Sequence, residues 1–278
     1  MSAAYRLARR QNDATSIVRV GSATFGGGGF TLVGGPCSIE SAEQIERAAQ
    51  GVRAAGGAML RGGAYKPRTS PYDFQGLGDK GLPLIAQAGA HAGLPVVVEA
   101  LAVAQVHLVA SFADMIQIGA RNMQNVPLLR AAAATGTPIL LKRGPSATLD
   151  ELLLAAEYVL LEGNANVVLC ERGIRGFDAN TRNVCDLGGA LRLRELTHLP
   201  VILDPSHASG RRSLIEPLTL AAAAAGLDGA IVEVHPEPEA ALCDADQAIG
   251  LDEFARIGAR VRAILAVLAE PELSYVLR

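Results

Sequence analysis

The sequence predicts an α/β protein built as a single (β/α)8 barrel, a TIM barrel, with a short N-terminal β-hairpin extension. From residue 31 onward, short apolar runs alternate with longer segments of helical period, which is typical of a parallel sheet with crossover helices. The predicted strands begin near Thr31, Ala58, Pro95, Met115, Pro138, Val167, Pro200 and Gly229. Eight strands match a closed barrel, with a doubly wound open sheet as the alternative because sequence does not show closure.

Helical segments lie between or after these strands. The clearest run over residues 42–54, 149–161, 213–225 and 251–269. A chain of 278 residues and 28.8 kDa suits one such barrel. We therefore assign residues 1–30 to the N-terminal extension and residues 31–278 to the catalytic barrel.

The segment before the first predicted strand has a different character. The apolar stretch 17–20 is followed by a glycine run at 26–29 and then by Phe30. The glycine run is not followed by Gly-Lys-Ser/Thr and opens no helix, so a phosphate-binding loop is disfavoured and a hairpin turn is favoured. We predict that this hairpin plugs the N-terminal face of the barrel.

Composition excludes several classes of protein. Half of the residues are hydrophobic and 19% are charged, which predicts a packed core rather than disorder. A net charge of −3 argues against a nucleic-acid or anionic-membrane binder. We find neither a run long enough to span a membrane nor a secretory signal. The four cysteines form no CxxC pair, which predicts a cytoplasmic protein with thiols free or bound to metal.

Positive charge gathers where the predicted strands end. The cations in question are Arg61, Lys66, Arg68, Arg121, Lys142 and Arg172. In an α/β barrel the C-terminal ends of the strands hold the active site, so these side chains predict an anion-binding mouth. They are too many for one phosphate and suit two phosphorylated ligands, or one that also carries a carboxylate. We interpret Arg143, Arg211 and Arg212 as ordinary surface charge.

A second constellation could bind a metal ion. Its members are Cys37, His207, Glu233 and Asp244. Each alone is more often a buried small side chain, a loop histidine or a surface carboxylate. Three of them end predicted strands one, seven and eight, which become neighbours when a barrel closes. Together they predict a mixed site for Mn²⁺, Fe²⁺, Co²⁺ or Zn²⁺.

Six segments resemble the 3-deoxy-D-arabino-heptulosonate 7-phosphate (DAHP) synthases of the type Iβ group. They are residues 35–41, 60–70, 118–125, 170–175, 204–207 and 232–236. The resemblance runs from about Tyr5 to the C-terminal helix. The related 3-deoxy-octulosonate 8-phosphate synthases share the barrel and much of the phosphoenolpyruvate site, but the stretch 66–69 looks like the DAHP synthase version. This implies erythrose 4-phosphate as the aldehyde substrate.

The resemblance implies a metal-dependent, aldol-like condensation of phosphoenolpyruvate with erythrose 4-phosphate, the first step of the shikimate pathway toward chorismate and the aromatic amino acids. The implied metal ligands are Cys37, His207, Glu233 and Asp244, with Mn²⁺ as the first choice and Co²⁺, Fe²⁺ or Zn²⁺ as alternatives. The implied phosphoenolpyruvate ligands are Arg61, Lys66, Arg121, Lys142 and Arg172. Arg68 and Thr69 are implied to bind the phosphate of erythrose 4-phosphate.

Catalysis is assigned to Lys66 together with the metal ligands Cys37 and His207. We expect Lys66 to donate a proton or to position the water, with a pKa lowered by neighbouring arginines and the metal. Val98, Val184 and Cys185 depart from the family pattern and leave fine substrate preference open.

Two other functions stay open: an octulosonate or related sugar-acid synthase, and a catalytically silent paralogue that only binds sugar phosphates. The complete ligand set argues against the silent paralogue. We expect a homo-oligomer, a dimer or tetramer. With no fused regulatory domain expected, we also expect the protein alone to be insensitive to aromatic amino acids, with control through a separate partner such as a chorismate mutase.

Overall fold

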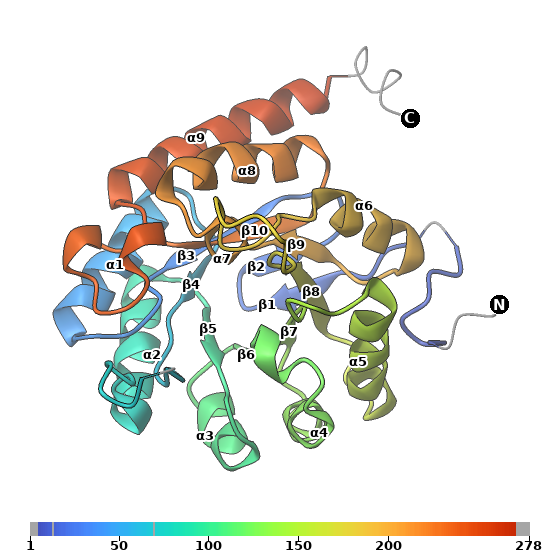
Figure 1. The fold of residues 1–278 in the computed structure, drawn as a ribbon, viewed down its shortest axis with the longest axis horizontal. Helices are drawn as coiled ribbons and strands as arrows, with labels where there is room; N and C mark the ends of the chain where they lie inside the picture. The colour runs from blue at the N-terminus through green and yellow to red at the C-terminus, as the bar shows by residue number, and fades with distance from the viewer. Residues whose placement is uncertain (1–4, 13, 69, 271–278) are drawn as a thin grey trace.

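The centre of the molecule is a closed barrel of eight parallel strands in the order β10-β3-β4-β5-β6-β7-β8-β9 (Figure 1). The computed structural model describes residues 5–12, 14–68 and 70–270. The barrel strands are β3 (Thr31–Gly35), β4 (Met59–Arg61), β5 (Val96–Glu99), β6 (Met115–Ile118), β7 (Ile139–Lys142), β8 (Val167–Glu171), β9 (Val201–Leu203) and β10 (Gly229–Glu233). Because β10 pairs with both β3 and β9, the predicted closed barrel is confirmed and an open sheet is excluded.

Helices surround the barrel on its outer side (Figure 1). The α-helices are α1 (Ala42–Ala54), α2 (Gly81–Ala92), α3 (Val106–Ala110), α4 (Val126–Ala134), α5 (Leu149–Leu161), α6 (Leu187–Leu196), α7 (Pro205–Ser209), α8 (Arg212–Ala224) and α9 (Leu251–Leu268). Short 3-10 turns are η1 (Gly78–Lys80), η2 (Val103–Gln105), η3 (Ala120–Asn122), η4 (Pro238–Ala240) and η5 (Ala245–Gln247). None of the helices within the described ranges is long and apolar enough to cross a membrane.

Local sequence explains where the longer helices begin. The Ser41 side chain accepts a hydrogen bond from the Gln44 amide at the start of α1. Thr148 and Glu151 form a reciprocal capping box at the start of α5. Such caps satisfy amide groups that have no partner within the helix. The predicted helices at 42–54 and 149–161 are accordingly confirmed at both ends.

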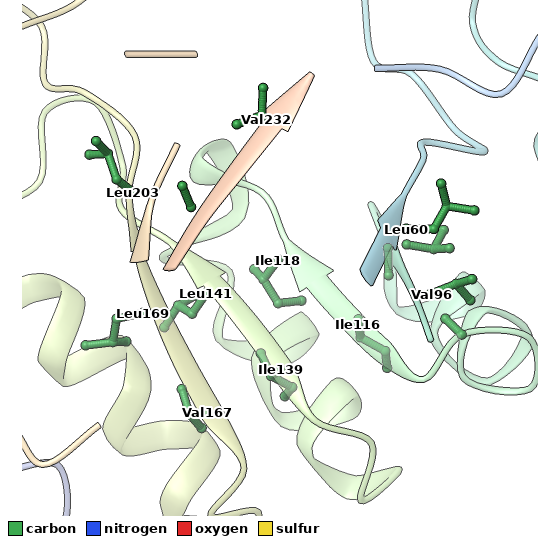
Figure 2. Close-up of a cluster of buried hydrophobic side chains, with 14 of the residues drawn as sticks. Leu60, Val96, Ile116, Ile118, Ile139, Leu141, Val167, Leu169, Leu203 and Val232 are labelled. Atoms are coloured by element: carbon green, nitrogen blue, oxygen red, sulfur yellow. The ribbon is translucent and has the colours of Figure 1, made fainter. Parts of the chain in front are cut away.

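Side chains along each strand alternate between two apolar clusters. In β6, Met115 points into the barrel, whereas Ile116 and Ile118 pack against the surrounding helices. Figure 2 shows the helix-facing set, from Leu60 on β4 to Val232 on β10. This alternation is the period of two that every strand imposes on its side chains.

The inward-facing positions change from apolar to polar along the barrel axis. The apolar level consists of Val33, Met59, Val97, Met115, Leu140, Val168, Ile202 and Ile231. Two residues later, the inward positions are Arg61, Glu99, Gln117, Lys142, Asp204 and Glu233. The same period of two therefore carries charged side chains into the mouth of the barrel.

The N-terminal hairpin closes the opposite end of the barrel. Its strands β1 (Val18–Val20) and β2 (Ala23–Phe25) are antiparallel, and their inward-facing side chains belong to the same interior cluster as the apolar level of the barrel. The predicted plug is confirmed, but the predicted turn is wrong. The hairpin turns at residues 21–22, where Gly21 has a φ of 54°, while the glycine run links β2 to β3. A two-residue hairpin loop requires positive φ, which Gly21 supplies at no steric cost.

We predict that Phe25→Ala lowers the free energy of unfolding by about 3 kcal/mol, because it removes a fully buried ring from the interior cluster. Thr24→Ala, on the exposed face of the same strand, should change it by less than about 0.5 kcal/mol. Urea denaturation followed by circular dichroism measures both values. Equal effects of the two substitutions would show that the hairpin does not contribute through its buried face.

Candidate functional site

A cavity of about 290 Å³ opens at the C-terminal ends of the barrel strands. The predicted cations that line it are Arg61, Lys66, Arg68, Arg121, Lys142 and Arg172. Its wall thus contains every predicted cation, although these residues are spread over more than 100 positions of the chain. The predicted phosphate ligand Thr69 lies outside the described residues.

Two of these cations are almost completely buried. Arg61 ends β4 and is 4% exposed, and its Nη1 lies 2.8 Å from Oε1 of Glu233. Lys142 ends β7, is 3% exposed and forms an ion pair with Asp204. A buried charge needs an opposite charge because desolvation otherwise costs several kcal/mol. The two carboxylates therefore hold these cations at the cavity wall.

The predicted metal ligands come together beside the cations. One donor atom from each of Cys37, His207, Glu233 and Asp244 lies within 4.8 Å of all the others. We call these residues the donor cluster. They reach one point because β9, β10 and β3 are neighbours in the closed barrel, and Asp244 is added by the loop that follows β10.

Gly35 at the end of β3 allows the β3–α1 loop to pass close to β4 and reach the donor cluster. Its φ is +142°, and a Cβ atom there would lie 2.1 Å from the carbonyl oxygen of Arg61. Any other residue would push the β3–α1 loop away from β4. Glycine at this position therefore brings Cys37, two residues later, next to the other donors.

His207 is oriented by a carboxylate on its far side. Its Nδ1 lies 2.7 Å from Oδ2 of Asp204, which leaves Nε2 directed toward Glu233, 3.3 Å from Oε1. Asp204 also accepts a hydrogen bond from the amide of His207 as the N-cap of α7. Burial lowers the pKa of His207, which favours the neutral imidazole that binds metals. This carboxylate–histidine arrangement is the usual support of a metal ligand.

Glu233 is held as an anion. Burial alone would raise its pKa, but interactions with the basic groups His207, Arg61 and Lys66 lower it to about 2. Its second oxygen, Oε2, accepts a hydrogen bond of 2.6 Å from Gln247. The side chain is therefore charged and fixed at neutral pH.

Asp244 adopts an uncommon backbone conformation. Its φ is 54°, the one positive value at a non-glycine residue in the described ranges. Such a conformation costs on the order of 1 kcal/mol or more and is found mainly at functional sites. Its Oδ2 lies 3.0 Å from Sγ of Cys37. The Cys37 thiol donates a hydrogen bond to this carboxylate, and its hydrogen bond with Cys243 and burial raise the pKa of the thiol. A divalent metal ion that replaces the thiol proton would be bound by a thiolate, an imidazole and two carboxylates, a donor set that such ions accept.

The structure corrects one expectation about Lys66. Burial lowers its pKa, but the electrostatic interactions with Cys37, Cys243 and Glu99 outweigh burial, and the pKa lies above the ordinary value. The predicted lowering considered the arginines and the metal but not these acidic groups. Lys66 is therefore a protonated amine at neutral pH.

The structure also corrects the interpretation of Arg143 as surface charge. Arg143 is 5% exposed, and its Nη1 lies 2.8 Å from carboxylate oxygens of both Glu171 and Asp186. It follows the inward-facing Lys142, so its side chain points away from the barrel interior. There it meets Glu171 at the end of the neighbouring strand. Arg211 is exposed, as expected.

Several cavity residues were not predicted. They are Asp73, Glu99, Gln117, Arg182 and Cys243. Glu99 and Gln117 carry a recognisable signal, because each lies two residues after an inward apolar side chain. Arg182 and Cys243 lie in loops, where no strand period indicates their direction.

The loop that carries Asp244 is anchored to the barrel by Glu40. Its Oε1 accepts a hydrogen bond of 2.9 Å from the amide of Leu242, and its Oε2 lies 3.4 Å from Nε2 of the buried His235. Two segments more than 200 residues apart are thereby held together. This contact fixes the approach of Asp244 to the donor cluster.

Comparison with known proteins gives a consistent result. Residues 13–266 match the model of the DAHP synthetase I family. The chain is 46% identical over 251 residues to the phospho-2-dehydro-3-deoxyheptonate aldolase of Thermotoga maritima, covering 90% of this chain and 74% of that protein. It is 32% identical over 273 residues to the 2-dehydro-3-deoxyphosphooctonate aldolase of Trichlorobacter lovleyi, covering 91% of this chain and 99% of the relative.

Solved structures agree with these sequence matches. The crystal structure of the Thermotoga maritima DAHP synthase superposes with a TM-score of 0.93 at 45% identity, over 95% of this chain and 78% of that one. A truncated form of the 3-deoxy-D-arabino-heptulosonate 7-phosphate synthase from Thermotoga maritima gives a TM-score of 0.88 at 42% identity, over 94% and 97% of the two chains. Fold and sequence thus point to the same relatives.

We predict that Asp244→Asn weakens Mn²⁺ binding at least about tenfold, because it removes a charged donor from the cluster. The control is Asp246→Asn, which removes the same charge from an exposed position of the same loop and should bind Mn²⁺ like the parent. Electron paramagnetic resonance of free Mn²⁺ measures both affinities, and circular dichroism checks the fold. Equal affinities for the two variants would remove Asp244 from the proposed ligands.

Proposed function

We propose that this chain, which belongs to the DAHP synthetase I family, is a DAHP synthase that joins phosphoenolpyruvate to erythrose 4-phosphate and releases phosphate. The observation that carries this conclusion is one cavity lined by seven arginine and lysine side chains and by His207 and Asp244 of the donor cluster. Two anionic substrates need such positive charge to approach each other, and an aldehyde carbon is attacked more readily when a Lewis acid polarises its oxygen.

The donor cluster would hold the divalent ion through Cys37, His207, Glu233 and Asp244. Sulfur, nitrogen and oxygen donors together suit Mn²⁺, Fe²⁺, Co²⁺ or Zn²⁺. When bound, the ion supplies Lewis-acid polarisation of the aldehyde oxygen. The chain's part is to present these donors in a fixed arrangement, which Asp204, Arg61 and Gln247 support from behind.

The phosphoenolpyruvate site is assigned to the cations nearest the barrel axis and to those beside them. Arg61, Lys66, Arg121, Lys142 and Arg172 would bind its phosphate and carboxylate. Guanidinium groups bind such oxyanions through paired hydrogen bonds. Because Arg61 and Lys142 are already fixed by buried carboxylates, little reorganisation is needed when the substrate enters.

The erythrose 4-phosphate site is assigned to Arg68, with Thr69 beside it in sequence. Arg68 lies at the cavity edge, where it pairs with Asp73 at 3.3 Å. In the reaction, C3 of phosphoenolpyruvate attacks the aldehyde carbon, water adds at C2, and phosphate leaves with cleavage of the C–O bond. Lys66, which carries its proton at neutral pH, would donate it to the alkoxide that the attack produces.

A second candidate is a 3-deoxy-octulosonate 8-phosphate synthase. Relatives with the name 2-dehydro-3-deoxyphosphooctonate aldolase match the chain over nearly their full length, although at only 32% identity. Both activities would use the same barrel and phosphoenolpyruvate site, so the identity of the aldehyde substrate distinguishes the two functions. A homo-oligomer, a chorismate mutase partner and a cytoplasmic location stay predictions.

With phosphoenolpyruvate and Mn²⁺ saturating, we predict that kcat/KM for erythrose 4-phosphate exceeds that for arabinose 5-phosphate by at least about 100-fold, because the two aldehydes differ in length and hydroxyl pattern. Phosphate release measures both rates. A preference for arabinose 5-phosphate would support the second candidate, and no turnover with either aldehyde would support a silent binding protein.

We predict that Arg68→Ala raises the KM for erythrose 4-phosphate, whereas Arg121→Ala raises the KM for phosphoenolpyruvate. Each lost charge-assisted contact should cost about 2 to 3 kcal/mol. Arg130→Ala, which removes an exposed arginine on α4, serves as the control and should alter neither constant. If both cavity variants changed the two Michaelis constants equally, our division of the cations between the substrates would be wrong.

A further inference from the structure

A second sulfur lies against the donor cluster. Sγ of Cys243 is 3.4 Å from Sγ of Cys37 and 3.7 Å from Oδ2 of Asp244. Cys243 is buried, lines the cavity and has no part in the reaction as described above. Its position therefore needs an explanation of its own.

The separations of these three donor atoms fit one face of a five-coordinate metal site. Their edges are 3.4 Å between the sulfurs, and 3.0 and 3.7 Å from Oδ2 to Cys37 and Cys243 respectively. With metal–sulfur bonds of about 2.3 Å and metal–oxygen bonds of about 2.0 Å, the angles of about 90 to 120° found in five-coordination separate two sulfurs by about 3.3 to 4.0 Å, and sulfur from oxygen by about 3.0 to 3.7 Å. The three observed edges fall within these ranges.

The backbone conformation brings both side chains to the same place. Consecutive side chains of an extended chain point in opposite directions, so residues 243 and 244 would not normally approach one sulfur together. The left-handed conformation of Asp244 bends the chain at this point, and both side chains contact Cys37. The strained residue thus delivers two donors, a thiol and a carboxylate, rather than one.

The other cysteines have different surroundings. Cys170 belongs to the apolar interior of the barrel, and Cys185 packs against the core between strands and helices. Cys243 instead lies 2.8 Å from Nη1 of Arg68. A guanidinium N–H donor beside a sulfur is the type of outer contact that stabilises a metal-bound thiolate.

We propose that Cys243 supplies a second thiolate to the metal ion of the donor cluster and thereby shifts the preference of the site toward thiophilic ions, Zn²⁺ and Co²⁺, relative to Mn²⁺. Thiolates favour such ions, whereas carboxylates suit Mn²⁺. The inference rests on the metal site proposed above and adds a ligand to it. It also gives this chain a metal preference that the four-residue cluster alone does not fix.

The test uses Co²⁺, whose near-ultraviolet charge-transfer band grows with each thiolate bound. Metal-free parent protein and the Cys243→Ser, Cys37→Ser and Cys185→Ser variants are titrated with Co²⁺. We expect Cys243→Ser and Cys37→Ser each to lose about half of the parent's band, and Cys185→Ser to keep all of it. Competition titrations should show the ratio of Zn²⁺ to Mn²⁺ affinity falling at least tenfold in Cys243→Ser, with Mn²⁺ affinity changed less than threefold.

A full-intensity band in Cys243→Ser, together with its loss in Cys37→Ser, would overturn this inference and leave the donor cluster standing. No band in the parent, with no metal binding, would overturn the cluster itself and the inference with it. A second measurement avoids substitution altogether. In the parent, Zn²⁺ should protect Cys243 and Cys37 from alkylation by iodoacetamide to the same extent, as read by peptide mass spectrometry, and protection of Cys37 alone would refute the role of Cys243.

Discussion

Charge that points into the barrel must be neutralised there, and the site is built around this requirement. Because side chains alternate between the two faces of a strand, Arg61 and Lys142 at the ends of β4 and β7 point into the barrel. Each is almost fully buried there. Unpaired, either charge would cost several kcal/mol. Glu233 at the end of β10 and Asp204 directly after β9, each two strands away around the barrel, supply the opposite charges. Barrel closure is therefore what makes the buried charges tolerable.

The N-terminal end of the barrel is stabilised by apolar packing, whereas the C-terminal end carries the charged candidate site. At the N-terminal end, the hairpin and the apolar level pack into one continuous interior cluster with no need for charge. At the C-terminal end, paired charges and the strained Asp244 take the place of apolar packing. Strain of this kind persists only where the surrounding structure fixes it. The Glu40 contact to the Leu242 amide is one such constraint.

The sequence allowed most of this architecture to be predicted because the signals are local and periodic. Strand positions were predicted to within one residue, since β-branched and leucine-rich runs end at glycine, proline or charge. The cavity cations were recognisable for the same reason. The errors concern relations that no local pattern contains: the turn at Gly21, the outward partner of Arg143, and the acidic groups that surround Lys66. Each of these features depends on contacts between strands and loops that are far apart in the sequence.

The shared carboxylates also connect the two halves of the site. Glu233 contacts Arg61 and His207 through the same oxygen, and Asp204 contacts Lys142 and His207 through one oxygen as well. Each carboxylate therefore contacts both the donor cluster and the buried cations of the cavity. Charge placed on one side changes the electrostatic balance of the other through a contact of about 3 Å. The donor cluster and the cations of the cavity thus form one electrostatic unit, held by two buried carboxylates that also neutralise Arg61 and Lys142.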